Sequence, residues 1–121
     1  MMVIDASVAV KWFLPEMGAH DAQQLLASGQ GLVAPSLIRV EVAAAIARKA
    51  RLKQIARQDA EAAADLWFEA IVDGVIGLVP DEADLPGALK LALALEHPLQ
   101  DCLYLALAER LGAPMFTADQ K

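Results

Sequence analysis

Short apolar runs alternate with longer segments of helical periodicity along the whole chain. The apolar runs that predict strands cover residues 2–5, 31–34, 75–79 and 115–117. The segments that predict helices cover residues 7–14, 19–27, 36–50, 58–73, 85–95 and 101–111. Short apolar strands separated by helices are typical of a parallel sheet with helices on both faces. The pattern therefore predicts a three-layer α/β/α fold around a mainly parallel sheet of four to five strands.

Local signals mark several ends of these elements. Pro15 closes the first helix, because proline cannot continue the helical hydrogen-bond pattern. Ser36 is suited to cap the helix that follows it, because its side-chain oxygen can accept a backbone N–H. Gly112 and Pro114 end the last helix before the final strand. We expect the helix over residues 58–73 to bury an apolar stripe made of Ala63, Leu66, Trp67, Ala70 and Ile71.

The composition is that of one compact domain, because 121 residues with 57% hydrophobic side chains suffice for one core. No segment approaches the roughly 18 consecutive apolar residues of a membrane span. Asp5 and Lys11 interrupt the apolar N-terminal run, so it is no signal peptide and we expect a cytoplasmic protein. The one cysteine, Cys102, is expected to be a small buried hydrophobe. A nucleophilic pair of Cys102 with His97 would lack an orienting third group.

The net charge of -6 hides a strong asymmetry along the chain. Five of the ten basic residues fall within ten positions, at Arg48, Lys49, Arg51, Lys53 and Arg57. The stretch 59–84 that follows holds eight of the sixteen acids and no base. Within it, an i,i+4 stripe of like charges is formed by Glu61, Asp65, Glu69 and Asp73. One explanation is that both charged runs are solvated helix surface. The alternative is that the basic run contacts phosphates and the acidic run forms a surface beside it.

Four acids are expected to meet at one edge of the predicted sheet. Asp5 and Asp119 each follow the end of a strand, and parallel strands all end at the same edge. Glu41 and Asp101 lie in early turns of helices that begin at that edge. The hydroxyl groups of the nearby Ser7 and Thr117 could support the acids through hydrogen bonds.

Each acid also has a separate explanation. Asp5 and Asp101 could cap the helices they precede, and Asp119 could be a turn residue in "TADQK". Glu41 is harder to explain in this way, because the first cation on its helix face is Arg48, two turns away. A joint site explains all four acids better than four separate roles do.

Clustered carboxylates repel one another unless a cation neutralises them. Hard oxygen ligands without a cluster of histidine or cysteine favour Mg²⁺ or Mn²⁺ over Zn²⁺. Such an ion can activate water for attack on phosphorus and stabilise the leaving oxygen, which points to phosphodiester hydrolysis. The sequence holds neither a G-x-x-x-x-G-K-[ST] loop nor a G-x-G-x-x-G loop, so a nucleotide cofactor has no support.

The stretches "VIDASVAVKWFLPE", "SLIRVEVAAAI" and "HPLQDCLYLALAERLGAPMFTADQK", in this order, resemble the PIN-domain ribonucleases, specifically the VapC-type toxins of toxin–antitoxin pairs. The resemblance covers nearly the whole chain and implies a single PIN-like domain over residues 1–121, with or without the family's last strand. It maps the family's acids onto Asp5, Glu41, Asp101 and Asp119, with Ser7 and Thr117 in supporting places. It implies an endoribonuclease that depends on Mg²⁺ or Mn²⁺, cuts structured RNA, forms a homodimer and is silenced by a cognate antitoxin.

In this interpretation the four acids hold the metal and serve catalysis, with Asp5 and Asp101 as the firmest ligands. RNA would be bound by a basic group consisting of Lys11, Arg48, Lys49, Arg51 and Lys53, extended to Arg57. The main alternative is a PIN-like module that binds a partner or a metal without cutting. A receiver-type phosphotransfer domain fits less well, because it needs an acid pair after its first strand and only Asp5 is present.

Overall fold

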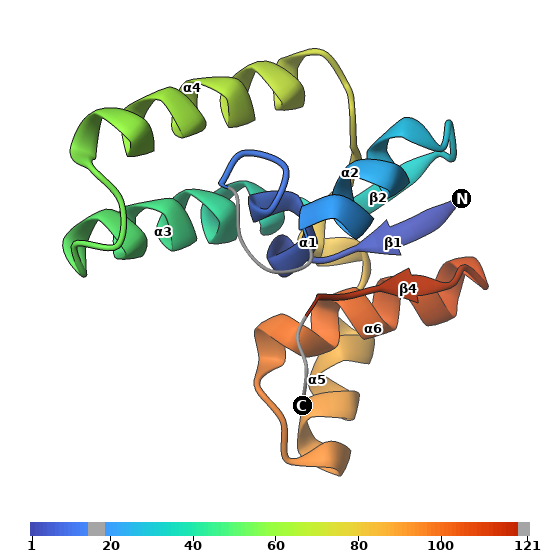
Figure 1. Ribbon diagram of the computed structural model, residues 1–121. Helices are drawn as coiled ribbons and strands as arrows, with labels where there is room; N and C mark the ends of the chain where they lie inside the picture. Colours follow the sequence, from blue (N-terminus) through green and yellow to red (C-terminus); the bar gives the residue numbers. More distant parts are fainter. Residues whose placement is uncertain (15–18, 119–121) are drawn as a thin grey trace.

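The computed structural model describes residues 1–14 and 19–118, and shows helices on both sides of a small parallel sheet (Figure 1). The strands of this part of the chain are β1 (Met2–Ile4), β2 (Leu32–Pro35), β3 (Gly77–Val79) and β4 (Met115–Phe116). They form one sheet in the order β3-β2-β1-β4, and every pairing is parallel. In the register, Val3 of β1 lies opposite Val33 of β2 and Met115 of β4. The predicted parallel sheet is thus confirmed, with four strands in the described residues.

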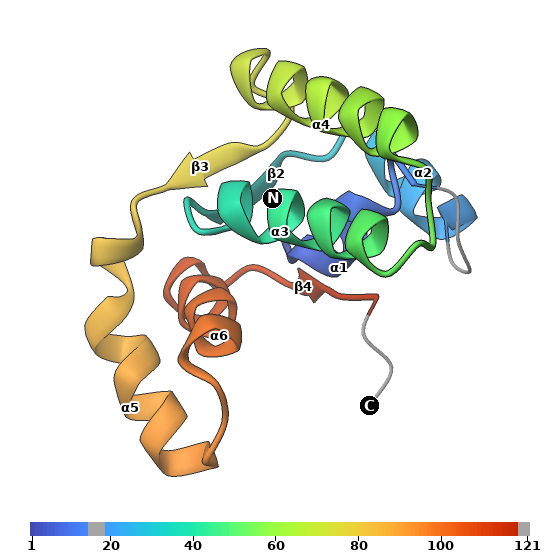
Figure 2. The same ribbon diagram turned by 90° about the vertical axis from the view of Figure 1, so that its left-hand side faces the viewer.

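The helices form two layers on opposite faces of the sheet (Figures 1 and 2). They are α1 (Ala6–Val10), α2 (Ala19–Ala27), α3 (Ile38–Arg51), α4 (Arg57–Val72), α5 (Leu85–Leu95) and α6 (Leu99–Leu111). A short 3₁₀ helix, η1 (Asp81–Ala83), precedes α5. Helices α1, α3 and α4 lie on one face, whereas α6 covers the other face with α5 packed against it. The three-layer α/β/α prediction is confirmed.

The core is centred on β1, where Val3 and Ile4 are fully buried. Ile38 and Val42 of α3 pack onto this core from one side, and Leu107 of α6 packs onto it from the other. Burying such side chains is the main favourable contribution to folding. Because α3 and α6 both contribute to this core, packing fixes the positions of their first turns relative to β1.

Helix α4 packs on α3 through a narrow stripe that contains Ala60, Ala63 and Trp67. Trp67 is fully buried, and its indole Nε1–H donates to the backbone oxygen of Arg39 in α3 at 3.2 Å. The expected burial of Leu66 is wrong, because 52% of this side chain is exposed. One neighbouring helix covers only part of the circumference of α4, and Leu66 lies about 100° around the helix from Trp67.

Two local predictions at helix ends are also wrong. The first helix ends at Val10 rather than at residue 14, because the chain continues in tighter turns in which the N–H of Trp12 donates to the oxygen of Ala9. The predicted cap, Ser36, does not cap α3, whose N-cap is Leu37. The Ser36 hydroxyl instead donates to the backbone oxygen of Val79 at 3.2 Å, which links the ends of β2 and β3.

Helices α5 and α6 form a second, smaller core between them. Cys102 is fully buried there together with Ala88, Leu103 and Ala106, as its apolar surroundings predicted. At one end of this pair, the guanidinium of Arg110 donates two hydrogen bonds to the buried carboxylate of Asp84, at 2.7 and 3.0 Å. A bidentate pair of this kind fixes the two helices in register.

Candidate active site

Three of the predicted acids lie at the edge of the sheet where the strands end. Asp5 directly follows β1 and is the N-cap residue of α1. Glu41 lies in the first turn of α3, which follows β2, and Asp101 lies in the first turn of α6, which leads to β4. Asp119 lies outside the described residues. The predicted convergence is therefore observed for Asp5, Glu41 and Asp101, whereas the roles of all four acids stay a prediction.

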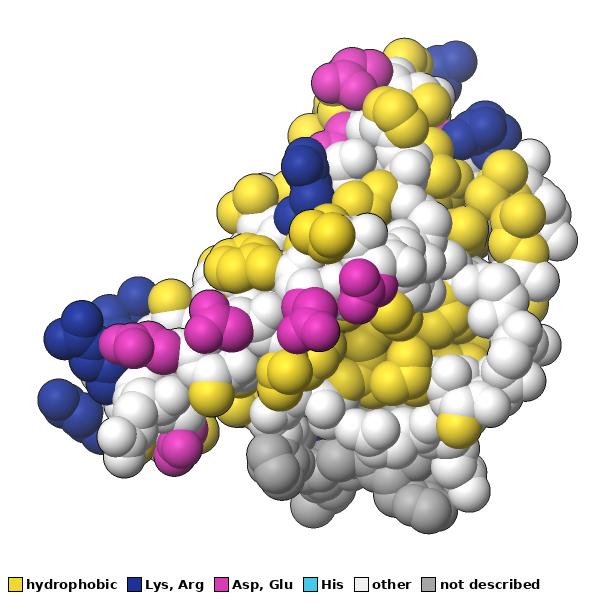
Figure 3. Space-filling view, turned by 90° about the horizontal axis from the view of Figure 1, so that it is seen from above, with side chains coloured by type: hydrophobic (Ala, Val, Ile, Leu, Met, Phe, Trp, Pro, Cys, Tyr) yellow, Lys and Arg dark blue, Asp and Glu magenta, His cyan; other side chains and the backbone are white. Residues whose placement is uncertain are grey.

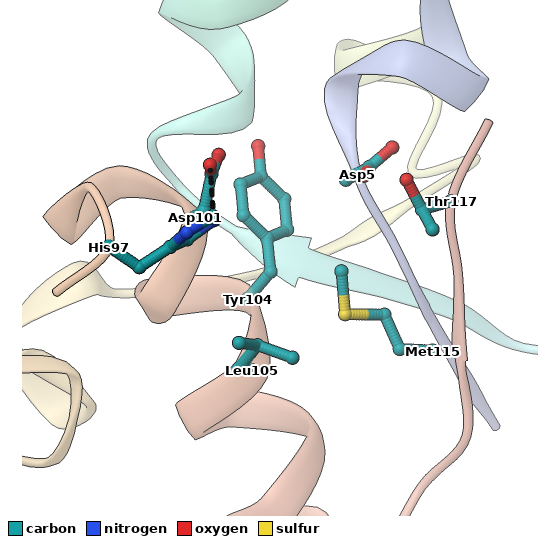
Figure 4. Close-up of a pocket in the computed structure, with 7 residues that line it drawn as sticks. All are labelled: Asp5, His97, Asp101, Tyr104, Leu105, Met115 and Thr117. Atoms are coloured by element: carbon teal, nitrogen blue, oxygen red, sulfur yellow. Dashed lines mark ion pairs between the residues drawn. The ribbon is translucent and has the colours of Figure 1, made fainter. Parts of the chain in front are cut away.

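A pocket of about 230 Å³ opens between β1, β4 and α6 at this edge (Figure 4). It is lined by Asp5, His97, Asp101, Tyr104, Leu105, Met115 and Thr117. Figure 4 shows Asp101 and Asp5 on opposite sides of the Tyr104 ring, with Thr117 beside Asp5. Carboxylates from two distant segments thus face one solvent-accessible space.

Asp5 is held in place by its own turn and by the end of β4. Its Oδ1 accepts hydrogen bonds from the Ser7 hydroxyl at 2.5 Å and from the backbone N–H of Val8 at 3.3 Å. The Ser7 oxygen accepts the backbone N–H of Ala118 at 3.0 Å and lies 3.5 Å from the Thr117 hydroxyl oxygen. Asp5 therefore caps α1 and faces the pocket at the same time, so the two explanations of this acid are compatible. Ser7 and Thr117 both lie beside Asp5, whereas their supporting role in catalysis stays a prediction.

Glu41 is partly buried beneath this edge, and its partner comes from α6. The Tyr104 hydroxyl donates to Glu41 Oε1 at 2.5 Å. The pKa of Glu41 is raised, mainly by burial; the hydrogen bond from Tyr104 opposes this rise, and the negative charges of Asp101, Asp5 and Asp81 add to it. The mutual influence of these charges shows that carboxylates from separate elements lie close together.

Tyr104 is a functional candidate that the sequence reasoning did not select. It is only 2% exposed, and burial followed by the contact with Glu41 raises its pKa far above the ordinary value. The phenol therefore stays protonated and acts as a donor. The signal in the sequence was its position, three residues after Asp101 on the same helix face.

His97 lies at the rim of the pocket, just before α6. Its Nε2 lies 3.1 Å from Oδ2 of Asp101, and both side chains are partly exposed. The i,i+4 spacing of His97 and Asp101 was visible in the sequence, but the sequence reasoning considered His97 only as a partner of Cys102. Cys102 is buried in the second core instead.

Asp81 is a fifth acid near the site, and the sequence reasoning placed it only in the acidic stretch 59–84. It begins η1 just after β3, and its Oδ1 accepts the backbone N–H of Leu37 at 3.0 Å. Its charge also contributes to the raised pKa of Glu41. The signal was available, because Asp81 is the first acid after the third predicted strand and parallel strands end at a common edge.

The carboxylate oxygens of these acids are ligands of the kind that a hard divalent cation binds. The described hydrogen bonds and ion pairs engage one oxygen of each acid: Oδ1 of Asp5, Oε1 of Glu41 and Oδ2 of Asp101. Within residues 1–14 and 19–118, no such bond reaches the second oxygen of these carboxylates. In the same residues, no three Asp, Glu, His or Cys side chains are already close enough to hold a metal ion. Carboxylates that repel one another would have to draw together around the ion.

Most of the basic group lies at the far end of α3 from Glu41, whereas Lys11 is the C-cap residue of α1. Arg48, Lys49 and Arg51 occupy the last turn of α3, and Arg48 and Lys49 line a shallow hollow of about 410 Å³ with Ala44, Ala45, Leu52 and Gln54. Arg57 forms an exposed pair with Glu61 at 2.8 Å. On the neighbouring α4, the stripe Glu61, Asp65, Glu69 and Asp73 is exposed. Figure 3 shows acidic side chains in a row, with basic side chains gathered at one end.

The sequence matches the PIN domain family over residues 2–121. The chain belongs to the PIN domain family. This PIN domain is 29% identical to Ribonuclease VapC3 of Pyrobaculum aerophilum, and the alignment covers 99% of the chain and 90% of the relative. The resemblance proposed from the sequence motifs is thereby confirmed. Among the described residues of this PIN domain, no helix has the length and hydrophobicity needed to cross a membrane.

Two solved structures share the fold of this PIN domain. One is VapC20 of Mycobacterium tuberculosis, a toxin that cleaves the sarcin-ricin loop, with a TM-score of 0.75 and 18% identity; the match covers 100% of the chain and 92% of the toxin. The other is a toxin–antitoxin complex from Klebsiella pneumoniae, with a TM-score of 0.64 and 15% identity. The match covers 100% of this PIN domain and 88% of the matched chain of the complex. At these identities, the likeness establishes the fold.

Proposed function

We propose that this PIN domain is a divalent-cation-dependent endoribonuclease, the toxin of a toxin–antitoxin pair, which hydrolyses phosphodiester bonds of structured RNA. The observation that carries the proposal is the meeting of Asp5, Glu41 and Asp101 at one edge, where burial and then the charges of Asp101 and Asp5 raise the pKa of Glu41. The relatives support the same activity, since one is named a ribonuclease and another is described as a toxin that cleaves the sarcin-ricin loop.

The cation would be Mg²⁺ or Mn²⁺, held by Asp5, Glu41 and Asp101, with Asp119 proposed as a fourth ligand. When bound, such an ion lowers the pKa of water and stabilises charge on the leaving oxygen. The chain itself orients the carboxylates: Ser7 holds Asp5, as the hydrogen bond at 2.5 Å indicates. A carboxylate oxygen outside these hydrogen bonds would accept a proton of the attacking water and direct its lone pair toward phosphorus.

The RNA strand would follow the face of α3 that carries both Glu41 and Arg48. These two side chains are seven positions apart, and at 1.5 Å per residue this is about 10 Å, the reach of one or two nucleotides. The stripe between them holds only the small side chains of Ala44 and Ala45. Phosphates on one side of the cut would therefore meet Arg48 and Lys49 first, with Arg51, Lys53 and Lys11 as further contacts.

A cognate antitoxin would silence the enzyme by carrying basic side chains into the acidic pocket. The fold shared with a chain of a toxin–antitoxin complex supports a partner of this kind. We further propose that the protein acts as a homodimer, as the family resemblance implies, and that it works in the cytoplasm.

The test is cleavage of bulk tRNA and ribosomal RNA by the purified protein with Mg²⁺ or Mn²⁺ and with the cation removed by a chelator. We expect cleavage to need the cation and to vanish in Asp5→Asn and Asp101→Asn. Asp65→Asn is the matched control, because it removes the same charge from the exposed side of α4. Full activity in Asp5→Asn and Asp101→Asn would place the chemistry elsewhere. Cation binding without any cleavage would favour the non-catalytic module.

A further inference from the structure

Tyr104 connects the two helices that carry Glu41 and Asp101. It belongs to α6, one turn after Asp101, and its hydroxyl reaches Glu41 of α3 across the sheet edge. The two bonded residues are 63 positions apart in the chain. Figure 4 shows the ring of Tyr104 between Asp5 and Asp101, with the hydroxyl pointing the same way as the carboxylate of Asp101. Tyr104 thus contacts Glu41 through its hydroxyl, while its ring lies between Asp5 and Asp101.

The hydrogen bond from Tyr104 restricts the side-chain conformations that Glu41 can adopt. A glutamate has three rotatable side-chain bonds, and the charges of Asp101 and Asp5 would turn its carboxylate away from the pocket. With Oε1 bound to the Tyr104 hydroxyl at 2.5 Å, the carboxylate keeps its place and Oε2 stays available. Hydrogen bonds of this kind orient ligating carboxylates in many metal sites.

We propose that Tyr104 is a positioning residue, whose hydroxyl holds the Glu41 carboxylate so that it can share a divalent cation with Asp5 and Asp101. This inference rests on the proposed function. It gives the phenol hydroxyl a task beyond core packing, to which Tyr104 contributes as a member of the main buried cluster. A phenylalanine would pack equally well, and so the hydroxyl can be tested separately from the ring.

The first experiment compares Mn²⁺ binding to the unchanged protein and to Tyr104→Phe by titration calorimetry. We expect about 10-fold weaker binding in Tyr104→Phe, the size of effect found when the hydrogen-bond partner of a metal ligand is removed. Cleavage should lose kcat at a fixed, subsaturating Mn²⁺ concentration while KM for RNA stays within about 2-fold, because Tyr104 does not reach the basic group on α3. Unchanged Mn²⁺ affinity in a folded Tyr104→Phe would overturn the inference.

A double-mutant cycle with Glu41→Gln separates positioning from a general effect on the fold. If Tyr104 acts through Glu41, Tyr104→Phe should cause no further loss of Mn²⁺ affinity once Glu41→Gln is present. An equal loss in both backgrounds would contradict this. Asp5→Asn and Glu41→Gln alone test the proposed function: if neither weakens Mn²⁺ binding, the cation site itself is wrong, whichever result Tyr104→Phe gives.

A spectroscopic test needs no variant of Tyr104. The chain has one tyrosine, so protein labelled with ¹³C at the ring Cζ of tyrosine gives a single signal from Tyr104. We expect this signal to move on addition of Mg²⁺ and again in Glu41→Gln, because both change the acceptor of the phenol. A signal that neither change moves would overturn the inference even if Tyr104→Phe failed to fold.

Discussion

The Asp81 carboxylate accepts the backbone N–H of Leu37 at 3.0 Å, which ties the segment after β3 to the start of α3. Leu37 is the N-cap residue of the helix that carries Glu41 and has no side-chain cap of its own. A helix start leaves several backbone N–H groups without partners inside the helix. Asp81, at the start of η1, therefore supplies the capping that α3 lacks locally.

Replacing Asp81 should show the size of this long-range cap. We expect Asp81→Ala to lower the free energy of unfolding by about 1 kcal/mol, the usual value of a lost helix cap. Asp81→Asn keeps an acceptor oxygen and should lose less. Urea denaturation of the three proteins measures the difference. Equal stability of Asp81→Ala and the unchanged protein would mean that water replaces the cap fully.

Glu41 should make stability without the cation depend on pH. Its folded-state pKa is raised above 4.5, so the folded protein holds this proton more tightly than the unfolded chain does. Protonation of Glu41 therefore favours the fold as the pH falls through the folded-state pKa toward 4.5, and this contribution is lost as the pH rises again.

The variant Glu41→Gln is neutral at every pH and should be more stable than the unchanged protein at pH 7 without a cation. This advantage should shrink as the pH falls toward 4.5. Thermal unfolding at several pH values in a chelating buffer measures it, and Glu69→Gln on the exposed side of α4 is the control. A pH profile that Glu41→Gln leaves unchanged would contradict the raised pKa.

The basic group should give RNA binding a marked dependence on salt. In a background made inactive by Asp5→Asn, we expect the affinity for RNA to fall steeply between low and physiological salt. The paired change Arg48→Gln and Lys49→Gln should lower the slope of log affinity against log salt by about 0.7 to 0.9 for each phosphate that is no longer neutralised. Fluorescence anisotropy measures both effects.

Lys90→Gln is the control for this series, because Lys90 is an exposed lysine of α5 and lies outside the basic group. It should change the slope little. A flat salt response of the parent protein would count against phosphate binding altogether, and an equal change in both variants would show that net charge rather than the α3 face sets the affinity.

Trp67 and Leu66 form a natural comparison on α4. Trp67→Ala should cost about 3–5 kcal/mol, because it empties a fully buried site and removes the donor to the oxygen of Arg39. Leu66→Ala should cost well under about 1.5 kcal/mol, since half of that side chain already lies in solvent. Chemical denaturation distinguishes the two, and similar losses would indicate that Leu66 is covered in solution.

The fold and the acids at its edge were predictable because they follow from patterns within single segments. Alternating apolar strands and amphipathic helices fix the layers, and the rule that parallel strands end together places Asp5, Glu41 and Asp101. The prediction for Asp119 stays untested, because this residue lies outside the described part of the chain.

What the sequence reasoning missed depends on pairs of residues that are distant in the chain. Ser36 looked like a cap, but its hydroxyl donates in the folded chain to the oxygen of Val79, 43 positions later. The bond between Tyr104 and Glu41 likewise arises only when α6 meets α3. Neither contact leaves a periodic signal, since each is decided by packing between helices and strands.

The contact of Ser7 with the Ala118 N–H joins residues that are 111 positions apart. During translation, the ribosome therefore makes one half of this junction long before the other. Until residues 99–118 have left the ribosome, the nascent chain lacks Asp101, Tyr104 and β4, even if its first helices have folded. The pocket between Asp5, Asp101 and Thr117 can therefore assemble only after α6 and β4 have been synthesised and have docked onto β1.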